Sequence, residues 1–324
     1  MDPVQMLLTA LRVDPGDDMA WLALADALEE QGQADRAELT RLSARLRRLR
    51  DDDERAEPER RMRELVAASV EPCVVRITNS IGMDLVLVPP GKFSMGSLSD
   101  ANPVYQDEHP RHEVEITRPF FLGRFPVTQR QYATVMYAHP SHFSRRNAGP
   151  QLEGLDTSSF PVESLTHPEA VAFCGRLSAL PSEVEAGRTY RLTTEAEWEY
   201  ACRAGSDRTT FHFGDTLTED QANFGKRLQR PCPVGLYPPN AWGLFDMHGN
   251  VWEWCSDWFA EDYYATGPGT NPTGPGDGTH YVLRGGAWFS TDVGCRCAHR
   301  GMDRVENRNA DTGFRVACGL GRAG

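Results

Sequence analysis

A pair of thiols and a histidine near the C-terminus are the residues of this chain whose types and spacing could do chemistry. They lie in the run Cys295-Arg296-Cys297-Ala298-His299-Arg300. Thiolates are nucleophiles and soft metal ligands, so two of them can hold a copper ion or form a disulfide. On a strand, Cys295 and Cys297 would face the same side and could share a metal ion. The alternative is that one or both pack in the core.

Two adjacent glycines precede these thiols. Gly285 and Gly286 follow the apolar run Tyr281-Val282-Leu283, where they let a strand bend sharply and bring its backbone close to another segment. Gly313-Phe314-Arg315 closes the same region. This C-terminal stretch is therefore either a functional site or the part of the chain that closes the fold.

The composition limits the classes of protein to which this chain can belong. Its 324 residues, 25% charged and 40% hydrophobic, suit one large soluble domain or two modest ones. A net charge of -12 argues against general nucleic-acid binding. No apolar run approaches the roughly 18 residues of a membrane span, and Met1–Leu11 lacks the basic start of a signal peptide. We expect a cytoplasmic protein with neither a nucleic-acid nor a membrane partner.

The remaining cysteines and histidines form no recognisable metal motif. The eight cysteines make no Cys-x-x-Cys pair, which argues against a zinc ribbon or a disulfide scaffold. Cys174 and Cys202 fall within helical patterns, and we interpret both as small buried hydrophobic residues. The histidines are dispersed and include no His-Glu-x-x-His motif.

The N-terminal segment has the periodicity of short helices. Trp21 and Leu28 lie on one apolar face, and Asp17 or Asp18 can cap the helix that carries them. We predict an all-α helical hairpin over residues 1–50, which resembles a tetratricopeptide-like, planctomycete-type companion segment. One hairpin cannot bury its own face, so it should dock on the next domain or on a protein partner. Residues 51–72 are a charge run, interpreted as a solvated helix or linker.

From residue 73 the pattern changes to short strands, turns and a few capped helices. Helices are predicted to begin after Thr128, Thr166 and Thr194, because each threonine has Gln or Glu three residues later or proline in the first turn. Two long loops, 139–160 and 259–280, are rich in Pro, Gly, Asn and Ser. The sequence predicts an α+β domain with little regular secondary structure.

An ordered series of motifs carries a family resemblance over residues 73–320. The motifs are Met95-Gly96-Ser97, Pro126-Val127-Thr128, Arg191-Leu192-Thr193-Thr194-Glu195-Ala196-Glu197-Trp198-Glu199-Tyr200-Ala201, Asp246-Met247-His248-Gly249-Asn250-Val251-Trp252-Glu253-Trp254, Arg284-Gly285-Gly286-Ala287-Trp288 and Gly313-Phe314-Arg315. The series resembles the formylglycine-generating enzyme, or sulfatase-modifying factor, family. The resemblance implies one compact domain with a variant of the C-type lectin fold.

The resemblance also implies a copper site that this chain has altered. Oxidising members use two cysteines, the first two residues after the Arg-Gly-Gly-Ser-Trp tryptophan and the second five residues later. Here Ser290 takes the first position and Cys295 falls at the second, while counting back from Arg300 shifts the register by three residues. A hydroxyl is not a soft ligand, so we expect the copper oxidase activity to be lost. Ala287 also replaces the family's serine.

Calcium is the second cofactor that the resemblance implies. Asp246, Gly249, Val251 and Glu253 match the structural calcium positions of the family, and Asn223 and Phe224 match half of another site. Carboxylate and carbonyl oxygens are the ligands that calcium accepts. The alternative for Asp246 and Glu253 is turn capping and a buried pair with an arginine.

The segment from Phe289 to Asn309 lies between two fixed anchors and resembles the region that diversity-generating retroelements rewrite in variable proteins. The candidate ligand-binding residues are Trp288, Ser290, Thr291, Asp292, His299, Arg300, Asp303, Glu306, Asn307 and Asn309. They suit a polar, adaptable surface for a protein or small-molecule ligand. We favour a binding module of pseudoenzyme type. The alternative is an oxidoreductase that acts on a peptide cysteine or a small molecule through Cys295 and Cys297.

Overall fold

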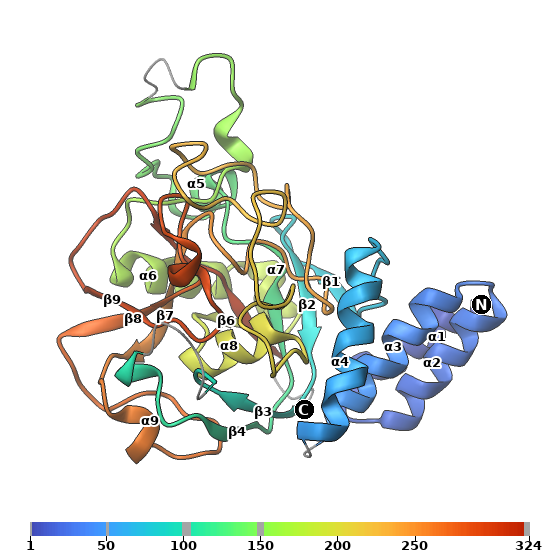
Figure 1. The fold of residues 1–324 in the computed structure, drawn as a ribbon. Coiled ribbons are helices and arrows are strands. Elements are labelled where there is room, and N and C mark those ends of the chain that lie inside the picture. The colour runs from blue at the N-terminus through green and yellow to red at the C-terminus, as the bar shows by residue number, and fades with distance from the viewer. Residues whose placement is uncertain (1, 50–51, 99–104, 148–151, 321–324) are drawn as a thin grey trace.

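Four helices form the N-terminal part of the computed structural model, which describes residues 2–49, 52–98, 105–147 and 152–320. They are α1 (Pro3–Val13), α2 (Asp18–Glu30), α3 (Ala34–Leu46) and α4 (Asp52–Ala67). Asp17 caps α2, as one of the two predicted alternatives, because its side chain accepts a hydrogen bond from the Ala20 N–H. The four helices lie together on one side of the molecule (Figure 1).

The helical part is joined to the following domain by partly buried hydrogen bonds. Trp242 Nε1 donates to Ser43 Oγ at 3.1 Å, and Arg55 donates to the Gly205 carbonyl at 3.0 Å. The backbone N–H of Arg208 donates to Glu59 at 3.1 Å. The helices therefore dock on this chain's own larger domain, one of the two surfaces expected for them.

The larger domain contains a five-stranded antiparallel sheet in the order β1-β2-β5-β11-β6. Its strands are β1 (Arg76–Thr78), β2 (Asp84–Val88), β5 (Phe120–Gly123), β6 (Arg188–Arg191) and β11 (Ala317–Leu320). The C-terminal strand β11 pairs with both β5 and β6. β11 is therefore an inner strand of this sheet, between β5 and β6.

A second sheet carries the segment with the predicted site. Its order is β10-β7-β8-β9, from β7 (Trp252–Trp258), β8 (His280–Arg284), β9 (Gly301–Arg304) and β10 (Thr312–Gly313). A separate hairpin pairs β3 (Gly91–Met95) with β4 (His112–Ile116). Residues 285–300 connect β8 to β9, and they contain the short 3-10 helix η4 (Asp292–Cys295). The strand geometry considered for Cys295 and Cys297 is therefore wrong.

The predicted helix starts in the larger domain are confirmed. Thr128, Thr166 and Thr194 each form a reciprocal capping box at the start of α5 (Gln129–Met136), α6 (His167–Ser178) and α8 (Glu195–Arg203). Shorter helices among the described residues include α7 (Pro181–Glu185), α9 (Tyr263–Thr266), η1 (Gln106–Glu108) and η3 (Thr157–Ser159).

These elements make the domain α+β, as predicted. Part of the predicted loop 139–160, residues 148–151, lies outside the described residues. Within the described part of the chain, no helix has the length and apolar character needed to cross a membrane.

Candidate functional site

A network of buried ion pairs fixes the segment between β8 and β9. Arg284 at the end of β8 pairs with Glu199 of α8, and both side chains are fully buried. The same guanidinium donates to the carbonyls of Cys297, Ala298 and His299 at 2.7–2.9 Å. One arginine therefore holds three successive carbonyls of the predicted site segment in place.

Two further arginines tie the same segment to distant elements. Arg296 contacts Glu108 of η1 at 2.7 Å, and Arg300 contacts Glu195 of α8 at 2.7 Å. Burial opposes ionisation of Glu108, but hydrogen bonds from His299, Arg296 and Ser97 lower its pKa to about 2. Arg300 is buried in its pair. This placement favours a structural role for Arg300 over the predicted ligand contact.

Ser290 and Cys295 each make contacts within the turn that follows β8. The Ser290 hydroxyl, in a residue only 9% exposed, accepts a hydrogen bond from the Ala287 N–H at 3.0 Å. Cys295 packs under Gly286, where an added Cβ would lie 2.5 Å from the Cys295 sulfur. Burial raises the pKa of the Cys295 thiol. These donors do not fit the two-thiolate copper site of the family.

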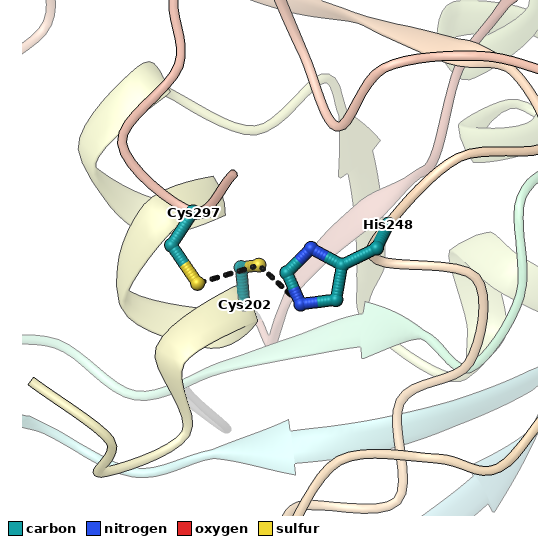
Figure 2. A group of neighbouring side chains, drawn as sticks. All are labelled: Cys202, His248 and Cys297. Carbon is teal, nitrogen blue, oxygen red and sulfur yellow. Dashed lines mark hydrogen bonds between the residues drawn. The ribbon is translucent and has the colours of Figure 1, made fainter. Parts of the chain in front are cut away.

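Cys297 points away from this turn, toward α8. Its sulfur lies 3.6 Å from the sulfur of Cys202, which is 4.0 Å from Nε2 of His248. Figure 2 shows the three side chains converging from a helix and two separate loops. Sequence reasoning missed Cys202 and His248, because they come from segments far apart in the chain and form no local motif.

The predicted calcium residue Glu253 is already engaged by other groups. Its two carboxylate oxygens accept hydrogen bonds from the Arg315 guanidinium at 2.8–3.2 Å and from Trp198 Nε1 at 2.8 Å. This is the buried pair with an arginine that the sequence left open as the alternative.

The side-chain oxygens of Asp246 and Asn223 accept fewer hydrogen bonds than those of Glu253. Asp246 accepts from the Gly235 N–H at 2.7 Å, and burial raises its pKa to about 6. Asn223 forms a backbone bridge with Gly249, which brings the two predicted calcium segments together. Among the described residues, the amide oxygen of Asn223 is buried with no hydrogen-bond partner. Phe224 is half-buried beside it and Val251 is buried.

The remaining candidate ligand-binding residues divide by exposure. Thr291, Asp292, Glu306 and Asn309 are exposed, whereas Trp288, His299, Asp303 and Asn307 are half-buried. Asp303 accepts hydrogen bonds from the side chains of Asn307 and Asn309, each at 2.5 Å. These contacts give the polar turn after β9 a defined shape.

Comparisons with known proteins agree with this architecture. The chain is 32% identical over 253 residues to the serine/threonine-protein kinase pkn1 of Chlamydia caviae, and the match covers 73% of this chain but only 38% of the kinase. It is 30% identical over 289 residues to the formylglycine-generating enzyme of Streptomyces coelicolor, covering 72% of this chain and 88% of that enzyme.

Two solved structures are similar along almost their whole length. Treponema denticola variable protein 1 has a TM-score of 0.63 and 27% identity, covering 75% of this chain and 99% of that one. PvdO from Pseudomonas aeruginosa has a TM-score of 0.64 and 26% identity, covering 76% and 98%. The model of the sulfatase-modifying factor enzyme 1-like domain matches residues 76–320. The chain therefore belongs to the sulfatase-modifying factor family, which is related to formylglycine-generating enzymes.

Proposed function

We propose that this protein is a binding module whose contact surface is the exposed part of residues 289–309, and that it is not a copper-dependent cysteine oxidase. The observation that carries the proposal is the role of Ser290. Its hydroxyl accepts the Ala287 N–H at 3.0 Å, at the position where the oxidase would need a soft thiolate. The position that supplies chemistry in oxidising relatives serves here to close a turn.

The chemistry of the surface supports recognition. Thr291, Asp292 and Glu306 are exposed polar residues, and they lie in the same segment as Phe289 and Met302, which are 41% and 53% exposed. Exposed aromatic and methionine side chains among adaptable polar groups are typical of contact surfaces. A protein or small-molecule ligand with both apolar and hydrogen-bonding groups would suit this surface.

The likeness to Treponema denticola variable protein 1 supports a more specific form of the proposal. Residues 289–309 would then be a segment diversified by a retroelement. The genomic neighbourhood tests this: a reverse transcriptase gene with a template repeat of this segment is expected. Without such a repeat, the proposal reduces to a binding module of fixed sequence.

A displayed peptide library tests the binding surface itself. Peptides selected on the full chain should bind a variant carrying Thr291→Ala, Asp292→Ala and Glu306→Ala at least about tenfold more weakly, because hot-spot contacts each contribute more than about 1.4 kcal/mol. A matched control carries Thr9→Ala and Glu30→Ala, which are exposed on the N-terminal helices, and should bind normally. Equal affinity for the two variants would contradict the proposal.

A structural calcium ion is part of the proposal, with a reduced set of side-chain ligands. Asp246 and the unpartnered amide oxygen of Asn223 offer the oxygen chemistry that calcium takes, while Glu253 is committed to Arg315. The ion would neutralise a buried carboxylate and hold the loop between Asp246 and Val251 against residues 223–224.

The alternative, an oxidoreductase that acts through Cys295 and Cys297, gains no support from the geometry. Cys295 packs against Gly286, whereas Cys297 contacts Cys202 of α8. The two thiols therefore face different surroundings. No contact among the described residues favours joint action of the pair on a substrate.

A further inference from the structure

We propose that Cys202, His248 and Cys297 form a buried binding site for one thiophilic d10 metal ion, Cu⁺ or Zn²⁺, beneath the proposed contact surface. The donor atoms of the three residues lie within 4.8 Å of one another. They come from α8, from the loop before β7 and from the segment after η4. The site is independent of what the surface binds.

The separations of the donor atoms suit a shared ion. Metal–sulfur bonds of about 2.3 Å and metal–nitrogen bonds of about 2.0 Å place neighbouring donors roughly 3.5–4.0 Å apart. The two sulfurs are 3.6 Å apart, and the Cys202 sulfur is 4.0 Å from His248 Nε2. Figure 2 shows the Cys202 sulfur between the Cys297 sulfur and the His248 ring. A disulfide would need the sulfurs at about 2.05 Å, and both cysteines are free.

Hydrogen bonds fix the histidine in the tautomer that a metal requires. His248 Nδ1 lies 2.7 Å from the carbonyl oxygen of Cys295; a carbonyl only accepts, so Nδ1 carries the proton. The backbone N–H of His212 approaches Nε2 at 3.3 Å, which also requires Nε2 to be unprotonated. A backbone carbonyl that holds the non-ligating nitrogen is the usual support of a metal-bound histidine. A bound ion would replace the long contact from His212.

The two sulfurs lie 3.6 Å apart, close enough to share one proton. A cation would replace that proton.

The number of donors distinguishes the two ions. Three donors complete a trigonal Cu⁺ site, whereas structural zinc almost always takes four. Among the described residues, only these three side chains form such a group. The His212 ring, which stacks on His248 at 4.6 Å, is buried with both ring nitrogens unpartnered. Zinc would have to recruit His212 by rotation of its side chain, and copper would not.

Metal loading of the purified full chain tests the site. The protein is prepared without oxygen, offered Cu⁺ or Zn²⁺ against a chromophoric chelator, and its bound metal is measured by mass spectrometry. We expect one ion per chain, held more than about tenfold more weakly by Cys202→Ser and Cys297→Ser. The matched control Cys295→Ser, a buried thiol of the same segment, should keep the wild-type affinity. His212→Phe should weaken binding only if the ion is zinc.

If the variants fail to fold, measurements on the wild-type chain test whether Cys202 and Cys297 bind the metal. The cysteines are all buried, so the protein is alkylated during unfolding in urea and read by peptide mass spectrometry. Bound metal should selectively slow the labelling of Cys202 and Cys297. Co²⁺ loading should give a thiolate charge-transfer band. Absence of bound metal, equal binding by Cys202→Ser, or metal that leaves the labelling of these two thiols unchanged would overturn the proposal. A Cys202–Cys297 disulfide in the anaerobic protein would do the same.

Discussion

The exposed face of residues 289–309 and the buried layer beneath it differ in how many contacts their side chains make. On the face, Thr291, Asp292 and Glu306 are exposed. In the layer beneath, Arg284 makes contacts with Glu199 and three carbonyls. A fold of this kind can change its surface residues while the buried layer keeps the backbone in place.

The largest expected effect comes from breaking the buried layer. Glu199→Gln leaves Arg284 and Arg203 without their shared carboxylate, and loss of one partner from a buried ion pair costs about 3–5 kcal/mol. Urea unfolding should show this loss of stability. The control Arg308→Ala removes an exposed pair with Glu169 and should cost less than about 1 kcal/mol. Similar losses for the two variants would remove the distinction between face and layer.

The next effect concerns the turn that closes over Cys295. Gly286 has φ +75, and a Cβ there would lie 2.5 Å from the Cys295 sulfur and 2.8 Å from the Gly294 carbonyl. Gly286→Ala should therefore lower the free energy of unfolding by more than about 1 kcal/mol. Gly276→Ala, where nothing lies within 4 Å, is the matched control. A thermal midpoint for Gly286→Ala equal to that of the control would contradict the packing described.

Asp246 should make stability depend on pH. Burial raises its pKa to about 6 from about 3.9 in the unfolded chain, so the folded state binds its proton more tightly. Stability should therefore fall as pH rises from about 4 to about 6, by up to about 3 kcal/mol, and stay reduced above that range. Asp246→Asn should remove this fall in calcium-free urea titrations, whereas Asp292→Asn should not.

The thermal midpoint in the presence of calcium is a second test of Asp246. Added calcium should raise the thermal midpoint of the wild-type protein at neutral pH, because a bound ion stabilises the folded state and neutralises the buried carboxylate. Asp246→Asn should show a much smaller rise. If the stability of Asp246→Asn still fell with pH as in the wild type, burial of the Asp246 carboxylate would not be the cause of that fall. If calcium raised the thermal midpoint of the variant as much as that of the wild type, Asp246 would be excluded as a ligand.

The smallest effects should come from the exposed face. Thr291→Ala, Asp292→Ala and Glu306→Ala should each change the free energy of unfolding by no more than about 0.5 kcal/mol. The peptide-binding measurement should nevertheless separate them from substitutions on the N-terminal helices. A large loss of stability from any of the three would show that the face is part of the framework.

Local signals in the sequence predicted much of the fold. The capping boxes at Thr128, Thr166 and Thr194 specify helix starts through contacts within four residues, and the ordered motifs identified the family. The site was harder to predict because its contacts are long-range. Cys297 contacts Cys202, which is 95 residues earlier in the chain. Cys295 lies in the 3-10 helix η4 and not on a strand, as had been considered.

An oxidation assay tests the central claim most directly. The full chain is incubated aerobically with copper and a cysteine-containing peptide, beside the formylglycine-generating enzyme of Streptomyces coelicolor as a positive control, and the peptide is analysed by mass spectrometry. Because Ser290 stands in the place of a soft ligand, the peptide thiol should stay unconverted while the control forms aldehyde. Catalytic aldehyde formation that disappears in Cys295→Ser would contradict the account.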